Sequence, residues 1–163
     1  MSRPFQDLEA ILAHLIAEHR RLLEHVTAHE TAMRSFDLKA MDAIATQQQA
    51  CRLRIAGWEE KRKATVAQIA RTMRVEPNLT LSRLADLHPP RRAELLRLRA
   101  ELKALAEQIA GRTKVAGRVA QAVLGHLNTA VRLLAGAVER AGVYTKSGAP
   151  KVTRRIGVME AVG

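Results

Sequence analysis

The sequence has few of the features on which secreted, membrane and metal-binding proteins depend. Its single cysteine, Cys51, can neither close an internal disulfide nor supply a cysteine-based metal site. No run of about 18 apolar residues occurs, so we expect no helix that spans a membrane. The N-terminal residues MSRPFQDLEA contain no apolar stretch ahead of a cleavage site, as a secretory signal would. These absences predict a cytoplasmic protein that does not insert into membranes.

Sequence patterns that carry catalysis are also missing. The stretch GRTKVAG at 111–117 has neither the spacing nor the Lys-Ser/Thr ending of a phosphate-binding loop. No Ser-His-Asp or Cys-His arrangement stands out, and Cys51 falls on a packing stripe, where cysteine is usually a small buried hydrophobe. We therefore expect neither an enzyme nor a bound cofactor.

One pair of histidines has a spacing that can bind a metal ion. His25 and His29 are four residues apart, so a helix places both on one face. The alternative is that His29 belongs to a packing stripe and His25 is its neighbour, which needs no metal. We favour this second interpretation and predict no metal site.

The residues that are abundant are typical of long helices. Hydrophobic residues make up 47% of the chain and aromatic residues only 2%. In segments 8–33 and 41–73 the apolar residues recur in alternating steps of four and three, the period of helices that pack along one seam. The sequence SFD at 35–37 separates the two segments, and Asp37 is a candidate N-cap for the second.

A third segment, the longest, follows the proline pair at 89–90 and continues to residue 141. As one helix it would be roughly 78 Å long at a rise of 1.5 Å per residue. The first two helices, with roughly 30 and 37 residues, are too short to cover that length. Part of its apolar face is therefore left without an intramolecular partner, and exposed apolar surface of that kind marks a binding site.

Together the segments predict an all-α protein: an elongated antiparallel helical hairpin with a third helix alongside, as in a three-helix coiled-coil bundle. The expected helices cover 5–35, 38–74 and 90–141. They form a single domain, 1–141, and residues 142–163 form a flexible basic tail. The most buried side chains are expected to include Leu12, Leu15, Leu22, Ile55, Trp58, Ile69, Leu98, Leu102 and Leu105.

The positive charge is concentrated toward the C-terminus. Of the formal net charge of +11, residues 111–163 contribute +7, from nine basic and two acidic residues. Such a field can steer an acidic partner, a nucleic acid or a membrane surface. The only tyrosine, Tyr144, lies in this region, after Ala141-Gly142 and before the turn-forming run SGAP at 147–150, where a helical core does not reach it.

Three stretches resemble a known family. HLNTAVRLLAGAVERAGVYTKSG at 126–148 is similar to a helix with the pattern Asn-x-x-x-x-Leu-Leu that ends in Tyr-x-x-x-Gly. TAMRSFDLKAMDAIATQQQACRLRI at 31–55 resembles the corner between the first two helices, and LTLSRLADL at 79–87 resembles the connector to the last. Arg62 matches an arginine late in the second helix. This layout resembles that of the FlgN family of flagellar export chaperones.

The resemblance implies a function and a set of partners. It implies a cytoplasmic chaperone for the flagellar type III export system that holds hook-associated (hook–filament junction) subunits before export. In such chaperones the distal half of the last helix and the tail bind the client, and the residues expected to do so are Val119, Val123, Leu127, Leu134 and Val138. The loaded chaperone then docks on the cytoplasmic domain of the export gate, and the tyrosine of the Tyr-x-x-x-Gly pattern, Tyr144, is the docking residue.

Other interpretations remain open from the residues alone. Lys146, Lys151, Arg154 and Arg155 could contact phosphates of a nucleic acid, although no recognition motif is present and nucleic acid is an unlikely partner. A structural coiled-coil adaptor would explain the heptads but gives Tyr144 no role. Tyr144 itself could instead fold back against the end of its helix.

Overall fold

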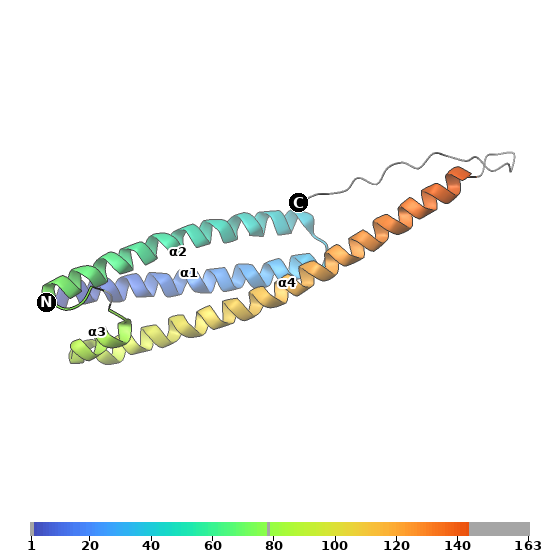
Figure 1. The fold of residues 1–163 in the computed structure, drawn as a ribbon. Coiled ribbons are helices and arrows are strands. Elements are labelled where there is room, and N and C mark those ends of the chain that lie inside the picture. Colours follow the sequence, from blue (N-terminus) through green and yellow to red (C-terminus); the bar gives the residue numbers. More distant parts are fainter. Residues whose placement is uncertain (1, 78, 144–163) are drawn as a thin grey trace. The chain divides into compact units, whose positions relative to one another are not determined.

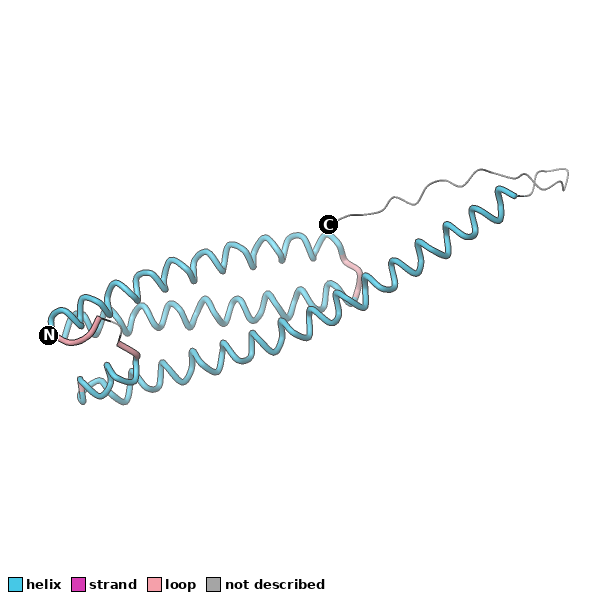
Figure 2. Tube along the Cα trace, viewed as in Figure 1, coloured by secondary structure: helices cyan, strands magenta, loops and turns pink. Residues whose placement is uncertain are grey.

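The computed structural model describes residues 2–77 and 79–143, and the side chains of residues 3–77 and 79–139. Within this part the chain forms helices and turns and no strand, which confirms the all-α prediction (Figures 1 and 2). The elements are α1 (Ser2–Arg34), α2 (Leu38–Met73), α3 (Leu81–Leu87), the 3-10 turn η1 (Pro89–Arg91) and α4 (Arg92–Val143). The three long helices begin and end within three residues of the expected positions.

The chain divides into two compact units, Met1–Ala120 and Gln121–Gly163, and α4 contributes to both. In the first unit α1 and α2 form an antiparallel hairpin, and the proximal part of α4 lies beside it (Figure 1). Residues 144–163, which include nearly all of the predicted basic tail, lie outside the described residues.

The corner after α1 and the corner after α2 are closed by the same pattern of backbone hydrogen bonds. After α1, the N–H of Asp37 donates to the carbonyl of Ala32 (3.0 Å) and the N–H of Phe36 to that of Met33 (3.2 Å). This pair of bonds is the Schellman motif, which needs a left-handed residue, and here Phe36 takes it with φ 55°. Asp37 then caps α2, because its side chain accepts from the N–H of Ala40 at 2.9 Å, as predicted.

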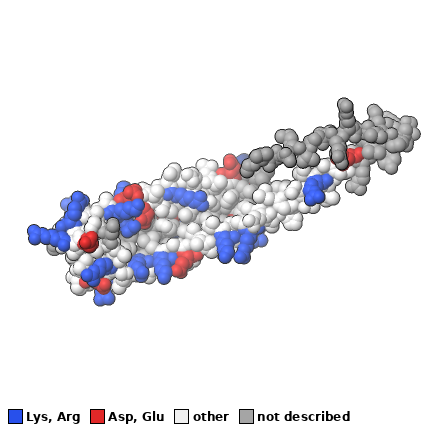
Figure 3. Space-filling view, in the orientation of Figure 1, with Lys and Arg blue, Asp and Glu red and all other residues white. Residues whose placement is uncertain are grey.

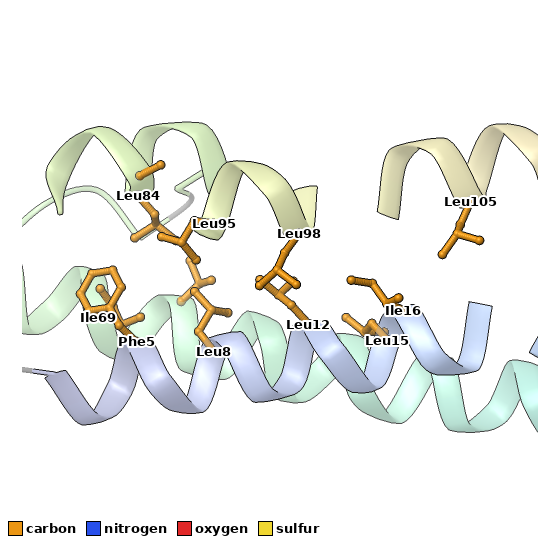
Figure 4. Packing of buried hydrophobic residues seen from close by; sticks show 12 residues of the cluster. Phe5, Leu8, Leu12, Leu15, Ile16, Ile69, Leu84, Leu95, Leu98 and Leu105 are labelled. Atoms are coloured by element: carbon orange, nitrogen blue, oxygen red, sulfur yellow. The ribbon is translucent and has the colours of Figure 1, made fainter. Parts of the chain in front are cut away.

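The core of the first unit lies between α1 and the elements that follow α2. Figure 4 shows leucines of α3 and α4 pointing toward an apolar face of α1, with Ile69 of α2 nearby. The cluster consists of Phe5, Leu8, Leu12, Leu15, Ile16, Val66, Ile69, Leu84, Ala85, Leu95, Leu98 and Leu105. A second, smaller cluster joins Leu22, Val26 and Cys51 farther along the hairpin. These contacts use the predicted seams.

Three residues expected among the most buried are only half-buried: Ile55, Trp58 and Leu102. All three pack against the core cluster from its edge and keep part of their surface exposed. The Trp58 indole stacks on the His14 ring with centroids 4.2 Å apart, and the Lys61 ammonium lies 4.1 Å from its centre. A large ring at a seam edge gains these polar neighbours instead of full burial, so the prediction was wrong for this residue.

Polar side chains also hold α1 and α2 of the hairpin in position against each other. The buried Gln48 donates from Nε2 to the backbone carbonyl of His25 at 3.1 Å. Glu18 of α1 is 6% exposed and accepts hydrogen bonds from Arg21 of its own helix at 2.7 Å and from Arg54 of α2 at 2.9 Å. The Cys51 thiol lies 3.2 Å from the backbone oxygen of Glu18. These contacts specify the register of α1 against α2.

Ion pairs join α1 to the segment that begins with η1. Arg91 donates to Glu9 at 2.9 Å, Arg20 pairs with Glu101, and Arg112 lies 3.7 Å from Glu30. Charged side chains of both signs are spread over the visible face of the first unit (Figure 3). Because most of these groups are partly exposed, they add little stability individually and mainly select the alignment of the helices.

Candidate functional site: an apolar stripe on α4

The first unit contains a shallow groove of about 240 Å³, and its walls are mostly apolar. Val26, His29 and Met33 of α1 and Gln48 and Arg52 of α2 form one side. Four small residues of α4 form the other: Thr113, Ala116, Gly117 and Ala120. The groove exists because α4 has no large side chain at this level to fill the space beside the hairpin.

Beyond Ala120 the same heptad register of α4 carries large side chains. Alternating steps of four and three residues lead along α4 from Thr113 through Gly117 and Ala120. The same steps then reach Leu124, Leu127, Val131, Leu134 and Val138. We call these last five residues the distal stripe. At 3.6 residues per turn they occupy a band about 80° wide on one helix face.

All five residues of the distal stripe are exposed, by 49% at Leu127 to 71% at Val138. A run of large aliphatic side chains at heptad spacing is what a helix buries against a partner helix. Leu133 is equally exposed, at 65%, but it lies about 140° around the helix from the centre of the stripe. Leu133 is therefore a single exposed leucine of the ordinary kind.

The surroundings of the distal stripe are small and weakly charged. The positions that flank it are Val123 and Ala130 on one side and Asn128 and Ala135 on the other. Between 121 and 139 the charged side chains are Arg132 and Glu139. Figure 3 accordingly shows mostly uncharged surface on the visible face of this stretch of α4. Small flanking residues let a partner helix approach closely, and the lack of charge removes a desolvation cost.

The predicted client-binding residues agree with the stripe only in part. Leu127, Leu134 and Val138 belong to it, whereas Val119 and Val123 are half-buried, and Val119 lies in the first unit. Leu124 and Val131 belong to the distal stripe and are not among the predicted residues. The strict four-three spacing would have found them, because it joins Leu127 to Leu124 and Val131 and leaves Val123 at the edge. Tyr144 lies outside the described residues, so its docking role stays a prediction.

The described residues offer little for other kinds of site. They contain no group of three or more His, Cys, Asp or Glu side chains placed to hold a metal ion. Within the described part, no helix combines the length and the hydropathy needed to cross a bilayer. The exposure of the distal stripe on α4 is therefore the feature that a proposed function has to explain.

Comparison with known families identifies the family of the chain. The family model described as FlgN protein matches residues 1–151, which include every described helix. The chain belongs to the FlgN family. Comparison with curated proteins and with solved structures gave no match. FlgN proteins are chaperones of flagellar export rather than enzymes, and as such they bind flagellar subunits. The FlgN assignment confirms the resemblance found in the sequence.

Proposed function

We propose that this chain is a cytoplasmic export chaperone for hook-associated, hook–filament junction subunits, and that it delivers them to the flagellar type III export gate. The distal stripe receives an amphipathic helix of the client and keeps that helix from assembling prematurely. The observation that carries the proposal is the exposure of five large aliphatic side chains at heptad spacing on α4.

The physical properties of this helix suit binding that must later be reversed. Gly125 and Gly136 each weaken the helix by about 1 kcal/mol relative to alanine. Ordering that occurs on binding subtracts from the affinity, so a client held by a marginal helix is released more readily. A chaperone that gives up its client at the gate needs that property.

Two neighbouring leucines allow a matched test of client binding. Leu134→Asp places a charge in the distal stripe, whereas Leu133→Asp makes the same substitution one residue earlier, off the stripe and at equal exposure. We expect Leu134→Asp to abolish binding of purified hook-associated subunits and Leu133→Asp to leave it within about twofold. Titration by calorimetry, with far-UV circular dichroism as a folding control, measures both. Equal binding by the two variants would refute the proposed surface.

Docking at the export gate is assigned to Tyr144. Truncating an interfacial tyrosine to alanine commonly costs 2 kcal/mol or more, on the order of a thirtyfold loss in affinity. We expect Tyr144→Ala to keep client binding and to weaken the client-loaded chaperone's affinity for the gate's cytoplasmic domain by that factor. Tyr144→Phe retains most of the affinity if ring packing dominates. Unchanged gate affinity in Tyr144→Ala would remove the docking role.

A further inference from the structure

The groove between the hairpin and α4 in the first unit is open although the packing does not require it. A glycine inside a helix is needed where another element approaches its Cα closely. A Cβ placed on Gly117 would meet no atom within 4 Å, so no such approach occurs here. Nearer to the start of α4 the same helix face carries Leu95 and Leu98, which pack into the core. The groove therefore leaves Val26 and Met33 of α1 without a large side chain opposite them.

The groove has the size and the chemistry of a pocket for one large side chain. Its volume is about 240 Å³, and an apolar cavity of about 150 Å³ is enough to bind benzene. A leucine, methionine or phenylalanine side chain therefore fits. Of the polar groups on its walls, the Gln48 amide already donates to the carbonyl of His25 at 3.1 Å. Arg52 and His29 also line the groove, and neither forms a hydrogen bond or an ion pair within the described part of the chain.

The charge around the groove is predominantly positive. Arg52 contributes to it from α2, and residues 108–138 of α4 include four basic side chains and no acidic one. The four are Arg112, Lys114, Arg118 and Arg132. The acidic residue Glu30 follows the groove residue His29 in the sequence, but it is already paired with Arg34 at 2.8 Å. An excess of positive charge beside an apolar pocket favours a partner that carries negative charge.

We propose that the groove is a second contact site for the client. It receives one bulky apolar side chain of an acidic amphipathic helix, and a carboxylate beside that side chain pairs with Arg52. The inference rests on the proposed function and specifies which client segments the chaperone selects. The α4 wall of the groove and the distal stripe belong to one face of one helix, so both contacts present the same heptad spacing to a client. An apolar anchor in a pocket supplies affinity, and the charged pair at its rim supplies selection.

Filling the groove from within tests the apolar part of the contact. Gly117→Leu places a large side chain in the groove, where its Cβ meets no atom of the chain. Gly111→Leu is the matched control, because its Cβ also meets no atom within 4 Å and it lies about 120° around the helix from Gly117. We expect Gly117→Leu to weaken binding of purified hook-associated subunits by about tenfold or more and Gly111→Leu to leave it within about twofold. Both changes replace glycine by a better helix former, and far-UV circular dichroism confirms that the helix is retained.

Reversing the charge at the rim tests the acidic part of the contact. We expect Arg52→Glu to weaken client binding several-fold at low salt, and the effect to shrink as salt is added, because an exposed charge pair is screened. Arg99→Glu makes the same change in net charge at an exposed position of α4 that forms no ion pair among the described residues. It should change client binding much less. Equal effects of Arg52→Glu and Arg99→Glu would overturn the pairing with a client carboxylate.

Client titrations with Leu134→Asp separate this inference from the function on which it rests. Unchanged client affinity in Gly117→Leu overturns the groove as a contact site, and the proposed client surface still stands if Leu134→Asp abolishes binding. Weakened binding in Gly117→Leu together with normal binding in Leu134→Asp supports the groove and refutes the distal stripe. Normal binding in both variants refutes both.

Discussion

Replacing Glu18 with glutamine tests whether the polar contact between α1 and α2 stabilises the first unit. The carboxylate accepts from Arg21 at 2.7 Å on one oxygen and from Arg54 at 2.9 Å on the other, with the Cys51 sulfur 3.5 Å away. Glutamine keeps the size and shape but has one acceptor oxygen and turns an amide NH2 toward a guanidinium donor. The variant therefore loses at least one charge-assisted hydrogen bond and the charge itself.

The expected cost follows from the burial of the groups. Hydrogen bonds that involve a charged group contribute about 1.5–3 kcal/mol each. The side chains of Arg54 and Arg21 are 46% and 59% exposed, so both guanidinium groups regain water when Glu18 is changed. Because this hydration offsets part of the lost hydrogen-bond energy, we expect Glu18→Gln to lower the free energy of unfolding by about 1–2 kcal/mol at pH 7.

The same contact makes stability depend on pH. Burial opposes ionisation of Glu18, but hydrogen bonds from Arg54 and Cys51 and the charges of Arg54 and Arg21 outweigh it, so the pKa of Glu18 is lowered. A carboxyl with a lowered folded pKa contributes stability above its unfolded pKa and loses it as the pH falls through the folded value. The difference in unfolding free energy between wild type and Glu18→Gln should therefore be fully present above about pH 4.5 and should shrink as the pH falls below that value.

Urea unfolding at several pH values measures this difference in stability. The unfolding is monitored by the fluorescence of Trp58, the chain's single tryptophan, and by circular dichroism at 222 nm. Glu60→Gln is the control, because Glu60 forms an exposed ion pair with Lys63 in which its side chain is 72% exposed. We expect the control to change stability by less than about 0.5 kcal/mol. A Glu18→Gln effect no larger than the control, or one that does not vary with pH, would refute the reasoning.

Two further substitutions test the packing and the corner of the first unit. Leu95→Ala should lower the free energy of unfolding in urea by about 2.7–5 kcal/mol, because Leu95 is fully buried between α4 and α1. Leu133→Ala, at an exposed position, should change it hardly at all. Similar effects for the two variants would show that α4 does not pack as described. Phe36→Gly should raise the free energy of unfolding by about 1 kcal/mol, because Phe36 is half exposed and holds a left-handed conformation that glycine adopts without strain. A thermal scan that shows Phe36→Gly to be less stable would mean that the exposed ring has a packing role.

The sequence was sufficient for the helices because each one is long and its apolar period is continuous. Asp37 was predicted as an N-cap, and its side chain accepts the expected backbone hydrogen bond. The Glu18 contact could not be predicted, because a glutamate on a helix normally faces water. Its partners Cys51 and Arg54 are 33 and 36 residues away in the sequence. Only the packing of the hairpin brings them together.

The exposed apolar surface of α4 was predictable as a region but not residue by residue. The comparison of helix lengths predicted that part of the apolar face of α4 is left uncovered, and the resemblance to the FlgN family placed the client surface in the distal half. The sequence alone does not show whether Val123 or Leu124 belongs to this exposed face, because the two residues are adjacent and both apolar. Exposure separates them: Leu124 is 65% exposed, whereas Val123 is half-buried.

One consequence follows from α4 being a single helix, Arg92–Val143, to which both units contribute. Starting a new helix is unfavourable by a factor of about 10⁻³, or about 4 kcal/mol, and residues 121–143 avoid that cost because they extend turns already formed by the first unit. The well-packed proximal half thus acts as a template for the distal half. Gly125 and Gly136 still weaken the individual turns, so the distal stripe lies on a helix that starts without a nucleation cost and yet opens more easily than the proximal half.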